Sequence, residues 1–241
     1  MRVLITLFVW YLLPQSTPAI MSREMADEAK SIVCIDPGHP SEVSSGAELQ
    51  NGTTEVHIAW MVSLKLQKAL QAKGCKVILT KSKEGELVKN KERAQIANAA
   101  GAALMIRLHC DATADSGYAL YYPDRQGTKE GVTGPTPEVM QRSQQAAETI
   151  HAAMATLLNG VLKDGGVRGD SKTLIGSKQG ALTGSIFSQV PVVTVEMVVL
   201  SNKTDAEFIK SEAGQKKMAQ ALAAGAMKFV GRKNKANKQD D

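Results

Sequence analysis

Residues 190–196 read Val-Pro-Val-Val-Thr-Val-Glu, an almost wholly apolar and mostly β-branched run that ends at a carboxylate. A run of this kind is typical of a strand buried on both faces, as in a parallel sheet covered by helices on either side. A carboxylate at the end of such a strand is costly unless it serves a site. The run therefore predicts a fold class and one candidate functional residue, Glu196.

Around this run, short apolar segments alternate with amphipathic patterns. Further strands are predicted at residues 32–35, 77–80, 104–108 and 118–122. Helices are predicted at residues 55–73, 93–100, 138–158 and 204–230. The last is opened by the capping box Thr204-Asp205-Ala206-Glu207, and a break within it remains open. Residues 123–137 are expected to be a polar loop and residues 231–241 a polar basic tail. The alternation predicts an α/β fold, a single-domain sandwich with a largely parallel central sheet flanked by helices, over residues 31–230.

The composition of the chain argues against several classes of protein. The chain has 241 residues, with 29 basic and 24 acidic side chains and a net charge of +5 spread along its length. Charge therefore gives no argument for nucleic acid, and we expect no such partner. Aromatic residues make up only 4%, which disfavours binding of sugars or bases mainly by stacking. Three cysteines exclude a disulfide-stapled scaffold, but a Cys34–Cys75 pair and buried free thiols both remain open.

The N-terminus has the features of a secretory signal. Met1-Arg2 precede an apolar run over residues 3–13. As a helix this run would rise about 16 Å, well short of the roughly 30 Å bilayer core. We expect a signal peptide over residues 1–19, cleaved after Ala19, and a secreted or periplasmic mature protein without a stable membrane span. An uncleaved signal anchor is the alternative.

Polar residues able to bind a metal or move protons follow three of the predicted strands. His39 follows the first strand, His109 follows the third, and Glu196 ends the last, while Glu55 lies in the first turn of a helix. Because sites in such sheets gather at the carboxyl ends of the strands, two histidines and one carboxylate can converge, with a second carboxylate beside them. A His₂Glu set suits zinc and leaves a fourth position for water. Glu196 is placed to take the proton of that water.

Six short motifs follow one another along residues 32–229. They are Asp36-Pro37-Gly38-His39; Gly46-Ala47 with Asn51-Gly52-Thr53-Thr54-Glu55; Gly74-Cys75-Lys76-Val77-Ile78-Leu79-Thr80-Lys81; Glu92-Arg93 with Ala97-Asn98; Arg107-Leu108-His109-Cys110-Asp111; and Val195-Glu196-Met197-Val198-Val199-Leu200-Ser201-Asn202. In this order they resemble the motifs of the zinc-dependent N-acetylmuramoyl-L-alanine amidases of the amidase-3 family.

The resemblance implies specific roles for these residues. His39, Glu55 and His109 would hold one Zn²⁺ per chain, and Glu196 would be the general base. The implied reaction is hydrolysis of the amide between the lactyl group of N-acetylmuramic acid and L-alanine, with peptidoglycan as the substrate. The sequence does not identify an activator or a targeting protein.

The chain departs from the family pattern near two predicted ligands. Pro40-Ser41 replace two glycines after the first histidine, Arg107 replaces a small serine, and Cys110-Asp111 replace Ala-Asn. No departure removes a predicted ligand or the base. They bear on substrate preference and rate more than on the chemistry.

Other polar residues have plainer interpretations. Asp36 and Arg93 are expected to be structural. His57 is the replacement ligand if the predicted glutamate is wrong, but its helical position points it away. His151 is expected to be solvated, and Cys110 to pack on the strand face opposite the neighbouring histidine.

Residues 127–137 form the one roomy insertion. They are rich in Gly, Pro and Thr, so we expect a loop and not a helix that blocks the site. Two other functions remain open on the same residues: a zinc carboxypeptidase, and a catalytically silent peptidoglycan-binding protein.

Overall fold

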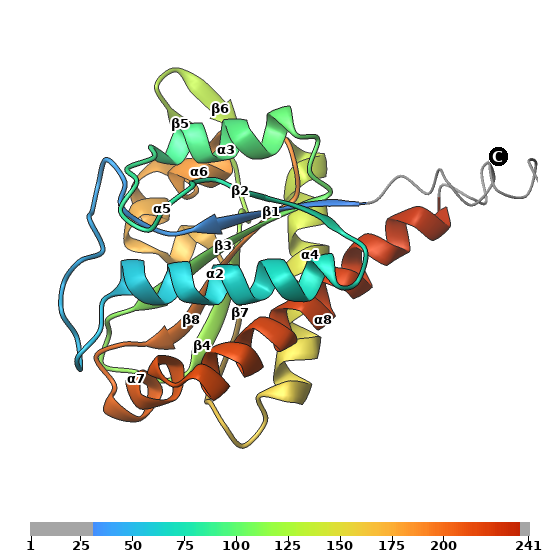
Figure 1. Ribbon diagram of the computed structural model, residues 1–241. Coiled ribbons are helices and arrows are strands. Elements are labelled where there is room, and N and C mark those ends of the chain that lie inside the picture. Colours follow the sequence, from blue (N-terminus) through green and yellow to red (C-terminus); the bar gives the residue numbers. More distant parts are fainter. Residues whose placement is uncertain (1–30, 237–241) are drawn as a thin grey trace, which may run out of the picture. The chain divides into compact units, whose positions relative to one another are not determined.

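A six-stranded sheet in the order β2-β1-β3-β8-β4-β7 is the centre of residues 31–236, the part of the chain that the computed structural model describes (Figure 1). The strands are Ile32–Pro37 (β1), Lys76–Leu79 (β2), Leu104–Asp111 (β3), Tyr118–Tyr122 (β4), Asp164–Gly169 (β7) and Val192–Val199 (β8). Neighbouring strands run parallel except β4 and β8, which are antiparallel. The predicted α/β sandwich with a largely parallel sheet is confirmed.

Helices cover both faces of the sheet (Figure 1). The first face carries α2 (Glu55–Gln71), α4 (Pro137–Leu157) and α8 (Glu212–Ala236), and the second carries α3 (Asn90–Ala99). The larger core lies on the first face, where Ile35 and Leu108 of the sheet join Ile58 and Leu66 of α2 in one buried cluster.

The second face changes character along the strands. Near the strand beginnings it carries a small buried cluster that includes Cys34, Met105 and Val192. Toward the carboxyl ends, residues in register on this face are polar: Asp36, Arg107, Thr194, His109 and Glu196. Because side chains alternate between the two faces of a strand, this polar row is separated from the larger core by the sheet itself.

Several predicted boundaries need correction. Glu196 does not end its strand, because β8 continues through three more buried residues to Val199. The segment at residues 123–137 contains no blocking helix, as expected. It is not an irregular loop, however, because β5 (Gly127–Lys129) and β6 (Val132–Gly134) form a hairpin within it.

Two helix predictions also change. Asn202, not Thr204, caps α7 (Lys203–Lys210), because its side chain accepts hydrogen bonds from the first-turn amides of Thr204 and Asp205. The break that the sequence left open lies at Ser211, between α7 and α8, and α8 runs past the predicted end at residue 230 to Ala236, into the expected tail.

Besides the β5–β6 hairpin, three short helical segments and one further strand were not predicted. They are β7, the 3-10 turn η1 (Asp170–Lys172), α5 (Leu174–Gln179) and α6 (Thr183–Ile186).

The cysteines of the described region are free. Cys34, Cys75 and Cys110 are all buried and unpaired. Cys34 belongs to the small cluster on the second face and Cys75 to the larger core, so the two face different layers. The expected signal peptide over residues 1–19 lies outside the described residues. Within residues 31–236, no helix has both the length and the apolar character that crossing a membrane requires.

Candidate metal centre

Three of the predicted side chains meet at the carboxyl ends of β1 and β3. One oxygen of Glu55 lies 3.1 Å from His39 Nε2, and the other lies 2.8 Å from His109 Nδ1. One ligand atom from each residue lies within 4.8 Å of the others. Ligand atoms this close together, two imidazole nitrogens and a carboxylate oxygen, fit a single metal ion.

The loop after β1 fixes His39. This residue has a φ of 55°, and its Nδ1 lies 3.1 Å from the Ser44 carbonyl oxygen. Gly46 has a φ of 62°, and a Cβ on it would lie 2.5 Å from Cβ of His39. Only glycine therefore fits where the loop folds back over the ring.

Glu55 and His109 are placed by regular elements. Thr54 caps α2, which leaves Glu55 in the first turn. The Cys110 backbone N–H, next to His109 in β3, donates to the same Glu55 oxygen that lies near His109 (3.2 Å). The Cys110 side chain points into the larger core, as predicted.

The charge states of Glu55 and His109 suit a metal. Burial alone would raise the pKa of Glu55, but the hydrogen bonds and charges of both histidines hold that pKa well below its usual range. Burial lowers the pKa of His109, although Glu55 opposes the shift. Burial would also lower the pKa of His39, but Glu55 raises it. An ionised carboxylate and a neutral His109 are the states that bind a cation.

A buried ionic cluster supports the His39 loop from below. Asp36 accepts hydrogen bonds from Arg93 Nη1 (2.5 Å), Arg107 Nε (2.9 Å) and the Thr80 hydroxyl (2.6 Å). Burial would raise the pKa of Asp36, but the two guanidinium groups hold it well below its usual range. Arg93 also donates to the carbonyls of Pro37 and Pro40, on either side of His39.

This cluster gives Asp36 and Arg93 the structural role that was predicted. The cluster also gives a structural role to Arg107, which departs from the family pattern. Besides its bond to Asp36, Arg107 donates a hydrogen bond to the side-chain oxygen of Asn90 (2.6 Å). Arg107 therefore braces β1, β3 and α3.

Glu196 lies beside the ligand triad. It pairs in register with His109 on the adjacent strand, which places the two backbones about 5 Å apart. Within the described region its buried Oε2 has no hydrogen-bond partner. Burial, together with the charges of Glu55 and Asp111, raises the pKa of this carboxyl well above its usual range.

The remaining histidines lie elsewhere. The exposed His57 lies 3.2 Å from Glu84 and is no ligand in this arrangement. His151, expected to be solvated, is instead three-quarters buried and lies 2.8 Å from a carboxylate oxygen of Asp164.

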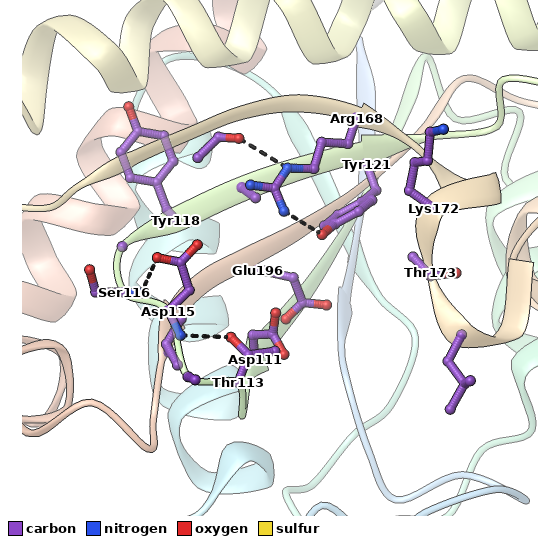
Figure 2. Close-up of a pocket in the computed structure, with 16 residues that line it drawn as sticks. Asp111, Thr113, Asp115, Ser116, Tyr118, Tyr121, Arg168, Lys172, Thr173 and Glu196 are labelled. Atoms are coloured by element: carbon purple, nitrogen blue, oxygen red, sulfur yellow. Dashed lines mark hydrogen bonds between the residues drawn. The ribbon is translucent and has the colours of Figure 1, made fainter. Parts of the chain in front are cut away.

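Two cavities adjoin Glu196. A small one of about 150 Å³ also touches His39, Arg107 and His109. A larger one of about 760 Å³ lies between β8, β4 and β7 (Figure 2). Its wall includes Arg168 and Lys172, which the sequence did not reveal because β7 was not predicted.

Comparisons with known proteins identify the family of this chain. The profile of the family described as N-acetylmuramoyl-L-alanine amidase (Amidase_3) matches residues 33–228. An N-acetylmuramoyl-L-alanine amidase of Mycobacterium tuberculosis is 26% identical, over 95% of this chain and 100% of its own.

Solved structures show the same fold. An N-acetylmuramyl-L-alanine amidase from Mycobacterium smegmatis superposes with a TM-score of 0.68 at 22% identity, over 84% of this chain and 97% of its own. The CwlD amidase of Clostridioides difficile, solved in complex with the GerS lipoprotein, superposes with a TM-score of 0.65 at 21% identity, over 84% of this chain and 100% of its own. The profile match covers most of the chain, which therefore belongs to the amidase-3 family of N-acetylmuramoyl-L-alanine amidases.

Proposed function

We propose that His39, Glu55 and His109 hold one Zn²⁺ per chain, and that Glu196 is the general base that hydrolyses the amide between N-acetylmuramic acid and L-alanine. One observation carries most of this proposal. Ligand atoms from three separate segments lie within 4.8 Å of one another, and the adjacent strand carries a carboxylate oxygen that has no partner among residues 31–236.

The donor set favours zinc. Two imidazoles and one carboxylate are a ligand combination of catalytic zinc sites, which keep a fourth position open. When bound, zinc would polarise the amide carbonyl and acidify the attacking water.

The position of Glu196 beside the triad supports its role as the base. Its carboxyl belongs to the row of polar residues on the second face, and the residue borders both cavities. From there the carboxylate would accept the proton of the attacking water and deliver it to the departing amine of L-alanine.

Peptidoglycan lies outside the cytoplasm, so the reaction requires export. We propose that residues 1–19 are a cleaved signal peptide, that the mature protein is secreted or periplasmic, and that residues 31–230 form the catalytic domain.

The test compares the mature wild-type protein with Glu196→Gln. Metal content is measured by atomic emission, and digestion of purified peptidoglycan is followed by analysis of the released peptides. We expect about one zinc per chain in both proteins, because Glu196 is not a ligand. Loss of the base should lower the rate by roughly 10²–10⁴-fold.

Two further variants calibrate the result. His109→Ala should lose both zinc and activity, whereas His57→Ala should keep both. Wild-type protein that binds no zinc and cuts nothing would instead support a silent peptidoglycan-binding protein. Release of C-terminal amino acids, in place of peptides that begin with L-alanine, would identify a carboxypeptidase.

A further inference from the structure

The larger cavity has a cationic wall that the metal centre does not use. Arg168 of β7 and Lys172 of η1 both line it and are both exposed. Figure 2 shows these two side chains and Tyr121 on one side of the cavity, with Glu196 and Asp111 on the other. A volume of about 760 Å³ is within the range of pockets that bind small organic molecules.

Sheet register places Arg168 and Glu196 on the same face. Tyr121 of β4 pairs with Thr194 of β8 on one side and with Arg168 of β7 on the other. Paired residues of neighbouring strands point to the same face, and Glu196 lies two residues beyond Thr194 on β8. The cations and the carboxylate therefore border one continuous space.

The Arg168 side chain is held but not neutralised. Its Nε donates to the Gly165 carbonyl (3.1 Å) and its Nη1 to the Tyr121 hydroxyl (3.4 Å). Among the described residues, neither Arg168 nor Lys172 forms an ion pair. Nη2 of Arg168 and the ammonium group of Lys172 are therefore free to bind an anion.

The acidic residues that line the cavity do not neutralise the positive charges of Arg168 and Lys172. Asp115 is already paired with Lys163 at 2.5 Å. Asp111 and Glu196 lie on the side of the metal centre (Figure 2). The cavity thus has an acidic end near the site of hydrolysis and a basic end away from it.

We infer that Arg168 and Lys172 bind a carboxylate of the stem peptide, and so direct the peptide, and not the glycan, into this cavity. This inference rests on the proposed function, because it assigns the two sides of the bond that is cleaved. N-acetylated sugars carry no charge that two cations could pair with, whereas the stem peptide carries carboxylates. Arginine suits such a group because its planar fork binds carboxylate oxygens in pairs.

The spacing limits which carboxylate is bound. β8 and β7 are separated by β4, so their backbones lie about 10 Å apart. An extended peptide covers about 3.3–3.6 Å per residue. The bound carboxylate therefore belongs to one of about the first three residues of the peptide.

The test uses a matched pair of substrates: a soluble muramoyl tripeptide with free peptide carboxylates, and the same compound with each carboxyl as a carboxamide. Wild type, Arg168→Ala, Lys172→Ala and Arg168→Lys are compared by kcat/KM on both. Lys178→Ala is the matched control, because Lys178 is an exposed lysine of α5 that does not line the cavity.

We expect Arg168→Ala to lower kcat/KM for the carboxylate substrate by about tenfold, the lower end of what a hydrogen bond to a charged group contributes. The carboxamide substrate should be cleaved equally well by all variants, and Arg168→Lys should recover part of the loss. An equal loss on both substrates, or no loss on either, would overturn the inference.

A binding measurement separates this inference from the proposed function. Calorimetry with the two free tripeptides requires no turnover. Carboxylate-selective binding that depends on Arg168, in a protein that cleaves neither substrate, would refute the proposed hydrolysis and leave the peptide site standing. Cleavage of both substrates at rates that do not depend on Arg168 or Lys172 would support the proposed hydrolysis and refute the peptide site.

Discussion

Asp36→Asn should destabilise the fold strongly, although it changes only one atom and creates no cavity. The Asp36 carboxylate is completely buried between two guanidinium groups whose side chains are 1% and 4% exposed. The neutral amide leaves Arg93 and Arg107 buried without a counter-charge. Breaking a buried ion pair by removing one partner costs about 3–5 kcal/mol.

That loss corresponds to a fall in Tm of about 6–20 °C, since 1 kcal/mol shifts Tm by about 2–4 °C in a domain of this size. Thermal unfolding at neutral pH, followed by circular dichroism, measures it. The control is Glu130→Gln, which removes an ion pair with Lys91 whose side chains are 39% and 55% exposed. An exposed pair contributes at most about 1 kcal/mol, so Tm should fall by less than about 4 °C.

The same variant makes a prediction about pH. Because the folded-state pKa of Asp36 is depressed, its contribution is fully present above the unfolded value of about 3.9 and is lost as pH falls below it. The difference between wild type and Asp36→Asn, measured as urea midpoints, should shrink below about pH 4. A fall in Tm at neutral pH no larger than that of Glu130→Gln would refute the reasoning.

Three other predictions concern different parts of the fold. Burial raises the pKa of Asp170 to about 6, so the ionised carboxylate opposes folding above that pH. Asp170→Asn should therefore raise Tm at pH 8 and increase the free energy of unfolding by at most about 3 kcal/mol. This gain should vanish as the pH falls from 6 to 4. All three cysteines should be inert to a thiol reagent in the native protein and all three reactive in denaturant, and fewer than three would show a disulfide. Gly46→Ala should weaken zinc binding at least about tenfold, because the new Cβ displaces His39. Gly52→Ala is the control: Gly52 also has a positive φ, but the nearest atom to a Cβ there is 3.5 Å away, so zinc affinity should be unchanged. An equal effect of both variants would show that backbone strain alone is responsible.

The sequence predicted that His39, Glu55 and His109 converge, because local patterns place each of them. A strand followed by His39 and another ending near His109 must bring both to one edge of a parallel sheet. The N-terminus of α2 is marked by Thr54, so Glu55 had to lie in its first turn. Convergence therefore followed from element order, without knowledge of any contact.

The ionic cluster beneath the site had no such local signal. Asp36 lies 57 residues from Arg93 and 71 from Arg107 in sequence. Sequence reasoning identified Arg107 only as a departure from the family pattern. Strand register explains it, because Arg107 faces Asp36 directly across β1 and β3.

The peptide cavity was missed for a different reason. β7 reads Asp-Gly-Gly-Val-Arg-Gly, and glycine disfavours strands. It forms by pairing with β4 at the edge of the sheet, where Gly165 packs so closely on the Tyr118 carbonyl that a Cβ would lie 2.6 Å from it. Tertiary contact, not local propensity, makes this strand, so Arg168 could not be placed from the sequence.

The position of β8 within the sheet explains how one residue can serve two sides of a reaction. Glu196 has His109 beside it on β3 and Ala119 beside it on β4. The proposed metal ligands lie on the β3 side and the proposed peptide cavity on the β4 side, so a bond held over Glu196 would have its carbonyl near the metal and its amine toward Arg168. Substitutions on the two sides should then separate: loss of a ligand abolishes cleavage of every substrate, whereas loss of Arg168 changes only which peptide is preferred.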